Sequence, residues 1–404
     1  MEKALIVVGY KTVNYGAAVQ AVATQRLFEK VGLRAEVLNL EKLWSVIRQK
    51  KVHFYLANLQ LSYIFHSKGK LYFSRVIRKF NRKYDMACDM RYKEFESFLK
   101  KNLSLTRVID DFNDAKIIAE NYEYVILGSD QVWLPSSVLT NVYDLSFAWD
   151  LERVKKVCYA PSFGVDYILP RYKNVYSNML RNIDCISVRE EAGVRLVNDL
   201  VGITPPMVAD PVLMLNKQEW ESIIPNEDIP EINYVFIYFL GNNKLHRRRA
   251  VEYAKKRGLT TVGLIHLDEY IKEDEKIYDK FYVSLSPGMF VNYIRNANVI
   301  FTDSYHCFLL SLIHHKKVGL YMRYSDKSTI STNNRLYSIM RRLNLKHGII
   351  DEKKEIKTED LISDYEVVDN KIEDFRKSSY QFIDHVIKKG LENDTFGERN
   401  NTCF

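Results

Sequence analysis

The segment Val299–Tyr321 contains the clearest candidate for chemistry in this sequence, a histidine at the start of a predicted helix. A short apolar run ends at Thr302-Asp303-Ser304, residue types that cap helices, and a helical apolar pattern follows. His306 therefore falls in the first helical turn after a strand, where open α/β sheets bind ligands. Unbonded backbone N–H groups and the positive end of the helix dipole favour an anion there. The alternative is a capped core helix that carries an incidental histidine.

Polar groups follow other apolar runs that we interpret as strands. They occur in Asn14-Tyr15-Gly16, in Gly128-Ser129-Asp130-Gln131-Val132-Trp133 and at Arg189. An arginine at a helix N-terminus opposes the helix dipole, so we expect Arg189 to face a bound carboxylate or phosphate, or to pair with Glu190 or Glu191. A glycine-poor loop with Gly241, Lys244 and His246 is a further candidate for phosphate. Plain turns are the alternative in each loop.

For these polar side chains to form one site, the fold must bring the ends of several strands close together. The strand Ala4–Val8, the helix Ala17–Val31 and the strand Ala35–Leu40 predict the opening of a doubly wound α/β domain. A chain of 404 residues is long for one core, so two domains are expected. We predict a first lobe at 1–224, with an insertion at 42–101, a second lobe at 225–365, and a C-terminal helix and tail at 366–404 that can pack back on the first lobe.

The positive charge of the chain is concentrated in the insertion Lys42–Lys101. This segment has 15 Lys or Arg and 4 Asp or Glu, a balance of +11 in a chain whose net charge is +8, which leaves the remainder at −3. A basic amphipathic helix is predicted at Tyr72–Tyr84. Such a helix can lie on an anionic membrane, and a basic patch with aromatic residues can suit nucleic acid. A solvated helical excursion is the third interpretation.

Cysteine spacing and hydropathy narrow the class of protein. The five cysteines are far apart and show no metal-ligand or redox spacing, which predicts a reduced, cytoplasmic setting and no metal site. No stretch approaches the ~18 apolar residues that a membrane-spanning helix needs. A content of 47% hydrophobic and 27% charged residues is typical of a soluble globular protein.

Six motifs, in this order, resemble those of the polysaccharide pyruvyl transferase family. They are Asn14-Tyr15-Gly16 with Gln20, Gly128-Ser129-Asp130-Gln131-Val132-Trp133, Tyr159-Ala160-Pro161-Ser162-Phe163-Gly164, Ile186-Ser187-Val188-Arg189-Glu190, Asp210-Pro211-Val212 and Thr302-Asp303-Ser304-Tyr305-His306. The resemblance implies an α/β fold of two Rossmann-like lobes in a GT-B-like arrangement, with the active site in the cleft between them.

The resemblance also implies that pyruvate is moved from phosphoenolpyruvate to a sugar, galactose-like and free or lipid-linked. The product is a cyclic ketal on a bacterial capsular polysaccharide or exopolysaccharide, and neither a cofactor nor nucleic acid is needed. By similarity, Arg189 clamps the donor, and His306 binds its phosphate or carboxylate or moves a proton. Asp130 is expected to contact the acceptor hydroxyls. The matching loops add Asn14, Tyr15, Gly16, Ser129, Gln131 and Trp133 as expected substrate contacts.

One position departs from the pattern of some family members. They have Arg-Leu-His where this chain has Ser304-Tyr305-His306, and their arginine helps to hold the donor. We therefore expect Ser304 to lie at the donor site and Arg335 or Lys244 to supply the missing charge.

Two other functions fit the same sequence. One is a GT-B-type glycosyltransferase that uses a nucleotide sugar bound in the second lobe, since fold alone does not fix function. The other is a non-catalytic glycan-binding or membrane-binding protein that acts through Lys42–Lys101. Peripheral contact with the inner face of the membrane through that segment is also compatible with the transferase.

Overall fold

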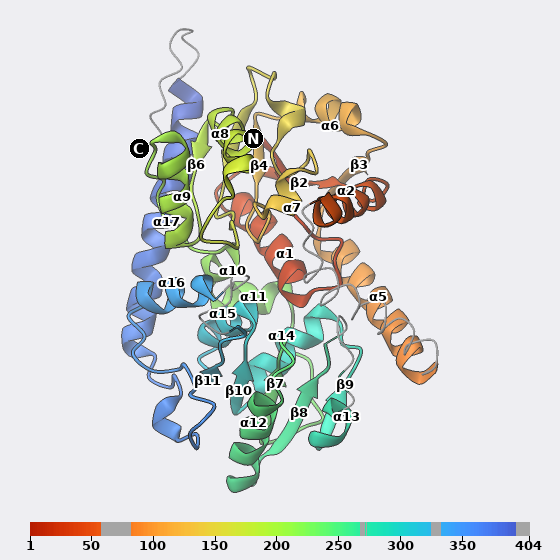
Figure 1. Cartoon of the computed structure of the whole chain (residues 1–404), viewed down its shortest axis with the longest axis vertical. Helices are drawn as coiled ribbons and strands as arrows, with labels where there is room; N and C mark the ends of the chain where they lie inside the picture. The colour runs from red at the N-terminus through yellow and green to blue at the C-terminus, as the bar shows by residue number, and fades with distance from the viewer. Residues whose placement is uncertain (58–81, 267–270, 272, 325–332, 393–404) are drawn as a thin grey trace.

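The computed structural model describes residues 1–57, 82–266, 271, 273–324 and 333–392, which form two lobes, one above the other in Figure 1. The first sheet has the strand order β3-β2-β1-β4-β5-β6 and the second has β11-β10-β7-β8-β9. All pairs within both sheets are parallel. In each sheet the chain first adds strands on one side of the lobe's first strand and then adds the remaining strands on its other side. This reversal of direction is typical of doubly wound sheets. The prediction of two Rossmann-like lobes is confirmed.

The strands of the first lobe are β1 (Lys3–Val7), β2 (Arg34–Asn39), β3 (Leu105–Val108), β4 (Tyr124–Leu127), β5 (Lys155–Cys158) and β6 (Cys185–Ile186). Those of the second are β7 (Tyr234–Tyr238), β8 (Thr260–Leu264), β9 (Lys280–Tyr282), β10 (Val299–Thr302) and β11 (Lys317–Leu320). The central strands β4, β7 and β10 are buried at every residue. Helices cover both faces of a parallel sheet, which explains why these strands are continuous apolar runs.

The helices of the first lobe are α1 (Tyr15–Lys30), α2 (Trp44–Ala57), α5 (Arg82–Asn102), α6 (Phe112–Ala119), α7 (Pro135–Val138), α8 (Pro170–Arg181), α9 (Glu191–Val201), α10 (Pro211–Met214) and α11 (Lys217–Ile223). The second lobe has α12 (Lys244–Lys256), α13 (Asp274–Ile277), α14 (Pro287–Asn296), α15 (Tyr305–Ile313) and α16 (Asn334–Arg342), and the chain's last described helix is α17 (Glu366–Glu392). Among the described helices, none has the length and apolar character needed to cross a membrane.

The structure corrects several predicted elements. The apolar residues of Met207–Ala209 and of His347–Ile350 predict two further strands. In the structure these segments contribute only single bridges, from Met207 to Val188 and from Ile349 to Leu320. The strand β3 was not predicted, because its alternating sequence has no continuous apolar run. Most of the predicted basic helix Tyr72–Tyr84 lies outside the described residues, and the rest forms the start of α5.

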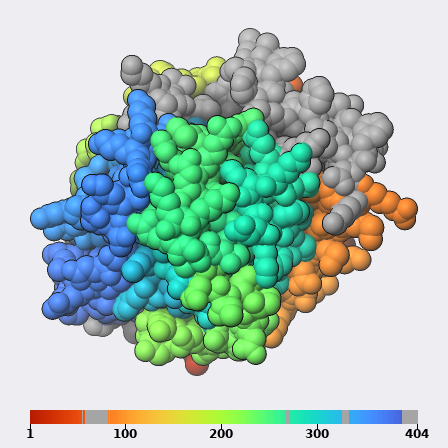
Figure 2. All heavy atoms as spheres, turned by 90° about the horizontal axis from the view of Figure 1, so that it is seen from below, coloured from red at the N-terminus to blue at the C-terminus, as the bar shows by residue number. Residues whose placement is uncertain are grey.

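Two helices join the lobes. In Figure 1, α17 runs along one side of both lobes, and α5 descends from the first lobe beside the second. Ser379 of α17 accepts a hydrogen bond from the Ala209 amide at 2.8 Å, and the Arg91 guanidinium of α5 donates to the Ile265 carbonyl at 2.6 Å. Figure 2, viewed from below, shows the two helices on opposite flanks of the second lobe. The described parts of the 42–101 segment, α2 and α5, are therefore packed on the body of the protein.

Tyr15 is the main aromatic contact between the lobes. It is 1% exposed, stacks on Phe290 at 4.6 Å between ring centroids, and donates its hydroxyl to the Leu285 carbonyl at 2.9 Å. Arg91 lies over the same ring. The second lobe encloses the Tyr15 side chain and gives it a structural role, while its expected substrate contact stays a prediction.

We predict that Tyr15→Ala lowers the free energy of unfolding by about 3–5 kcal/mol, because it removes a buried ring from a close-packed interface. Tyr15→Phe keeps the ring and loses only the hydroxyl bond, so it should cost about 1 kcal/mol. Urea denaturation of the whole chain measures both values. Equal and small effects of the two substitutions would contradict this role for the ring.

Candidate functional site

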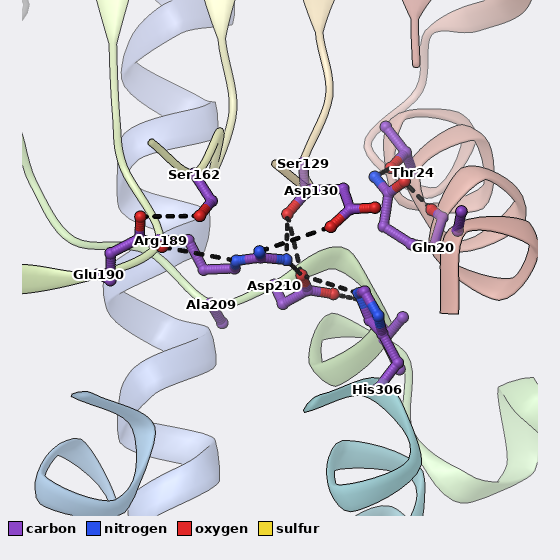
Figure 3. A network of polar contacts seen from close by, with 12 residues as sticks. Gln20, Thr24, Ser129, Asp130, Ser162, Arg189, Glu190, Ala209, Asp210 and His306 are labelled. Carbon is purple, nitrogen blue, oxygen red and sulfur yellow. Dashed lines mark hydrogen bonds and ion pairs between the residues drawn. The ribbon is translucent and has the colours of Figure 1, made fainter. Parts of the chain in front are cut away.

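The carboxyl ends of both sheets face each other at the junction of the lobes, and a buried ion pair lies there (Figure 3). The Arg189 guanidinium donates to the Asp210 carboxylate at 2.6 Å and to the Ser129 hydroxyl at 3.2 Å. The side chains of Arg189 and Asp210 are 1% and 0% exposed. The cost of removing these two charges from water is offset only because they pair closely. Arg189 thus has a strong partner, Asp210, that sequence reasoning did not assign.

Asp210 is fixed by its place at the start of α10. One carboxylate oxygen accepts the amide of Val212 at 2.9 Å, which caps the helix, and Pro211 occupies the first helical position. The other oxygen receives Arg189 and the Ser129 hydroxyl, and lies 3.6 Å from Nε2 of His306. The sequence signals for this role are the Asp-Pro pair before an apolar stretch and its place in the motif Asp210-Pro211-Val212.

The electrostatic surroundings keep Asp210 ionised. Burial by itself raises the pKa of the Asp210 carboxyl, but its interactions with His306 and Arg189 outweigh burial and hold that pKa well below its usual range. Asp130 follows the same pattern: burial raises its pKa, and His306, Arg189 and Arg335 lower it by more. Both carboxylates therefore carry negative charge at neutral pH.

His306 lies in the first turn of α15, as predicted, and projects across the junction toward the first lobe (Figure 3). It contacts the first turn of α1, because a Cβ atom on Gly16 would lie only 2.3 Å from its Nδ1. Gly16 thus leaves space for the imidazole, and its expected substrate contact stays a prediction. His306 Nε2 is buried and makes no hydrogen bond within the described structure. The ring is held in place with one nitrogen at ion-pair distance from Asp210.

Tyr305 brings two guanidinium groups together. The Arg189 guanidinium carbon lies 4.6 Å from the centre of the Tyr305 ring, and that of Arg335 lies 5.7 Å from it. Burial and the nearby charge of Arg189 lower the pKa of Arg335 to about 10, which leaves it protonated at neutral pH. Two cations on one aromatic ring repel each other, and a bound anion relieves that repulsion. Arg335, predicted as a source of charge beside Ser304, is therefore part of the cluster.

The helix α16, which carries Arg335, also contacts the first lobe. Arg341 donates to Glu191 at 2.6 Å, and Asn334 donates to Asp166. A small pocket lined by Gly164, Glu190, Arg335 and their neighbours lies at the same junction. The second lobe thus contributes both His306 and Arg335 to a site whose carboxylates come from the first.

Asp130 is the more accessible carboxylate of the cluster. Its side chain is 27% exposed, and its Oδ1 lies 3.7 Å from Nη2 of Arg189. Its backbone has φ of 82°, a conformation that few residues other than glycine adopt. The turn after β4 therefore holds Asp130 in a strained backbone conformation. The neighbouring Gln131 has a buried Nε2 with no hydrogen bond among the described residues. Asp130 and Ser129 therefore belong to the cluster, and Gln131 follows them in the same turn, where its expected substrate contact stays a prediction.

Glu190 is the third carboxyl near Arg189. It accepts hydrogen bonds from the Ser162 hydroxyl at 2.8 Å and the Phe163 amide at 3.1 Å, and its Oε2 lies 3.8 Å from Nε of Arg189. Burial raises the pKa of Glu190 despite the charge of Arg189. The pairing of Arg189 with Glu190, one of the alternatives from the sequence, is thus present but longer than the bond to Asp210.

Four predicted site residues have other roles. Asn14 and Ser304 cap α1 and α15, accepting the amides of Ala17 at 3.2 Å and Cys307 at 3.4 Å. Trp133 is 0% exposed and packs on Phe163 in the core. The Lys244 ammonium, 61% exposed, pairs with Glu273 at 2.8 Å. The structure therefore does not bring the Trp133 ring or the Lys244 charge to the cluster.

The loop after β7 is closed by Asp303. The amides of Leu240 and Gly241 donate to its two carboxylate oxygens at 2.7 and 2.8 Å, and Nε of Arg323 lies 3.5 Å from the same carboxylate. These amides, which sequence reasoning offered to a phosphate, are occupied within the protein. In the described part of the chain, no three His, Cys, Asp or Glu side chains are grouped so that they could hold a metal ion.

We predict that Gly16→Ala lowers the free energy of unfolding by about 1–3 kcal/mol, although alanine is the better helix former, because the new methyl group collides with His306. Gly288→Ala is the matched control in α14. Its Cβ would meet no atom closer than 3.6 Å, so it should be neutral or stabilising. Equal urea midpoints for the two variants would contradict the contact between α1 and His306.

The Asp210 carboxyl should make stability depend on acid pH. Because its folded pKa lies below the unfolded value of about 3.9, its contribution is complete above that value and is lost as pH falls toward the folded pKa. We predict that Asp210→Asn costs about 3 kcal/mol at pH 7, since it leaves Arg189 without its closest partner. Between pH 5 and 3 the difference from the unaltered protein should narrow. A constant difference over that range, measured by urea denaturation, would contradict the depressed pKa.

Comparisons with known proteins agree with this fold. One similar structure is a Listeria monocytogenes protein described as a putative UDP-N-acetylglucosamine 2-epimerase. The match covers 98% of each chain, with 13% identity and a TM-score of 0.50. The UDP-GlcNAc 2-epimerase of Neisseria meningitidis has 12% identity and a TM-score of 0.44, over 96% of this chain and 100% of that one. An α-glucosyltransferase solved with UDP and DNA has 12% identity and a TM-score of 0.48, over 97% and 98% of the two chains. At such identities the likeness concerns the fold, which is the two-lobed α/β arrangement of GT-B type.

No curated protein matches the sequence. The family model of polysaccharide pyruvyl transferases matches residues 14–326, a span that includes Gly16, Asp130, Arg189, Asp210 and His306. The chain therefore belongs to the polysaccharide pyruvyl transferase family.

Proposed function

We propose that this protein transfers pyruvate from phosphoenolpyruvate to two hydroxyl groups of a sugar and forms a cyclic ketal. The observation that carries the proposal is the convergence of Arg189, Arg335 and His306 around Tyr305. Phosphoenolpyruvate has a carboxylate and a phosphate on adjacent positions of a three-carbon unit. Cationic groups that are fixed in advance favour such a compact, multiply charged ligand.

Buried nitrogen atoms beside the ion pair support this proposal. Nε and Nη2 of Arg189 and Nε2 of His306 are buried and make no hydrogen bond with the described residues. Such atoms are rare in folded proteins, where buried polar groups are normally paired. Anionic oxygens of the donor would satisfy them, while Asp210 holds the Arg189 side chain rigid through its other nitrogen, Nη1.

The reaction divides between the two lobes. The donor's methylene carbon gains a proton, a hydroxyl oxygen of the sugar bonds to the central carbon, the phosphate leaves with the electron pair of its C–O bond, and the second hydroxyl closes the ring. The two hydroxyl protons end on the new methyl group and on the phosphate, so the step is balanced. Asp130, the exposed carboxylate, receives a hydroxyl proton, and His306 moves a proton at the donor. Arg189 and Arg335 stabilise the negative charge that grows on the leaving phosphate.

The departure at Ser304 fits this proposal. Ser304 caps α15, and Arg335 approaches the same turn from α16 through the Tyr305 ring. We infer that Arg335 provides the positive charge that some family members place at the Ser304 position. The alternative, a nucleotide-sugar site in the second lobe, is less well supported, because Asp303 occupies the Leu240 and Gly241 amides after β7.

We propose a galactose-like acceptor, free or lipid-linked, in the biosynthesis of a bacterial capsule or exopolysaccharide. The enzyme would then act in the cytoplasm, with peripheral membrane contact through 42–101 where the acceptor is lipid-linked.

Calorimetric titration of the whole chain with phosphoenolpyruvate tests the donor site. We predict that Arg335→Met weakens binding about 10–100-fold, because it removes charge-assisted contacts to the donor. Arg341→Met is the control on the same helix. Its guanidinium is 58% exposed and pairs with Glu191, so binding should stay within about twofold.

Three results would contradict the proposal. They are no binding by the unaltered protein at millimolar phosphoenolpyruvate, equal affinity in the Arg335→Met variant, or tight binding of a uridine diphosphate sugar in place of phosphoenolpyruvate.

A further inference from the structure

Lys51 reaches the carboxyl edge of the first sheet without joining the cluster around Arg189. It follows the buried Ile47 by one turn of α2 and so lies on the same side of the helix. Its Nζ lies 5.6 Å from the centre of the Tyr143 ring, which is 2% exposed. Tyr143 covers the end of β1, because a Cβ atom on Gly9 would lie 3.4 Å from the Tyr143 hydroxyl. The Lys51 ammonium is therefore placed near the end of β1.

This ammonium has no carboxylate partner at ion-pair distance in the described part of the chain. Burial lowers the pKa of Lys51 to about 8, and the more distant charge of Asp130 opposes this effect. The Lys51 side chain is half-buried, and partial removal of an ammonium from water without a counter-ion is unfavourable, which contact with an aromatic ring compensates only partly. The preceding residue, Lys50, is different, since it donates to the Thr140 carbonyl at 3.2 Å and lies over the Phe112 ring.

The strand order places Lys51 and Arg189 on opposite sides of Asp130. The first sheet runs β1-β4-β5-β6 from its centre to one edge. Lys51 lies near the end of β1, Asp130 follows β4, and Arg189 follows β6. The side of Asp130 toward β6 is occupied by the cationic cluster that we assign to the donor. The side toward β1 is left for the acceptor, and Lys51, whose ammonium interacts electrostatically with Asp130, lies on that side.

We propose that Lys51 binds an anionic group of the acceptor, a phosphate or a carboxylate, and thereby orients the acceptor hydroxyls toward Asp130. The inference rests on the proposed function and goes beyond it, because it assigns the acceptor to the acidic sugars. An oxyanion supplies both the counter-charge and the hydrogen-bond acceptors that the ammonium lacks. A neutral sugar supplies no counter-charge. Lys51 is thus a determinant of acceptor specificity.

Titration calorimetry of the full chain tests this inference with three probes, galactose 1-phosphate, galacturonate and galactose, each added in the presence of phosphoenolpyruvate. We expect the unaltered protein to bind at least one of the two acidic sugars more tightly than galactose. Lys51→Met should weaken that binding tenfold or more and leave the affinity for phosphoenolpyruvate within twofold. Lys50→Met, the matched control, should leave both affinities within twofold. Preference for the phosphate or for the carboxylate identifies which anion the acceptor carries.

Each contrary result overturns the inference. These results are equal binding of acidic sugars by the Lys51→Met and unaltered proteins, no preference for an acidic sugar over galactose, no binding of any of the three sugars, or a loss of phosphoenolpyruvate affinity in Lys51→Met that makes Lys51 a donor residue. Failure of the proposed function is seen separately, as absence of phosphoenolpyruvate binding by the unaltered protein.

Discussion

The buried ion pair between Arg189 and Asp210 is the interaction on which the rest of the site depends. Two charges enclosed at the junction of the lobes are tolerated only with close pairing and additional hydrogen bonds, which Ser129 and the Val212 amide provide. The same pair fixes the guanidinium plane against Tyr305 and keeps a negative charge beside His306. The cluster therefore forms only when the lobes associate, because the first lobe supplies the ion pair and the second supplies the ring, the imidazole and Arg335.

The sequence was sufficient for the architecture, because parallel sheets covered on both faces leave a strong local signal. Runs such as Tyr124–Leu127 and Thr260–Leu264 coincide with β4 and β8, and Pro287–Asn296 coincides with α14. The weak elements were the short ones at sheet edges. The apolar content of Met207–Ala209 predicts a strand, but in the fold it forms one bridge to Val188 before the chain turns into α10.

The sequence predicted the position of charged and titratable side chains that follow strand ends. It did not predict which aromatic side chains would be enclosed by packing. His306, Arg189 and Asp130 meet as expected. Tyr15 and Trp133 stand in equally suggestive loops but are enclosed by Phe290 and Phe163, which are far away in sequence. Asp210 lies in a motif that the sequence shows, but its pairing with Arg189 depends on contacts that only the tertiary fold creates. The position of Lys51 depends on such contacts as well, and no local pattern indicated it. Gly16 was expected at the site, but the need for a glycine there comes from the close approach of His306, which only the tertiary fold creates.

The most direct test of the account is a transfer assay with the purified chain, phosphoenolpyruvate and a panel of neutral and acidic galactosides, with products weighed by mass spectrometry. The account predicts a product that gains one pyruvate less one water, together with one equivalent of released phosphate. It also predicts that His306→Gln forms this product at least about 100-fold more slowly. Phosphate release without a pyruvylated sugar, or sugar transfer from a nucleotide sugar with phosphoenolpyruvate inert, would contradict it.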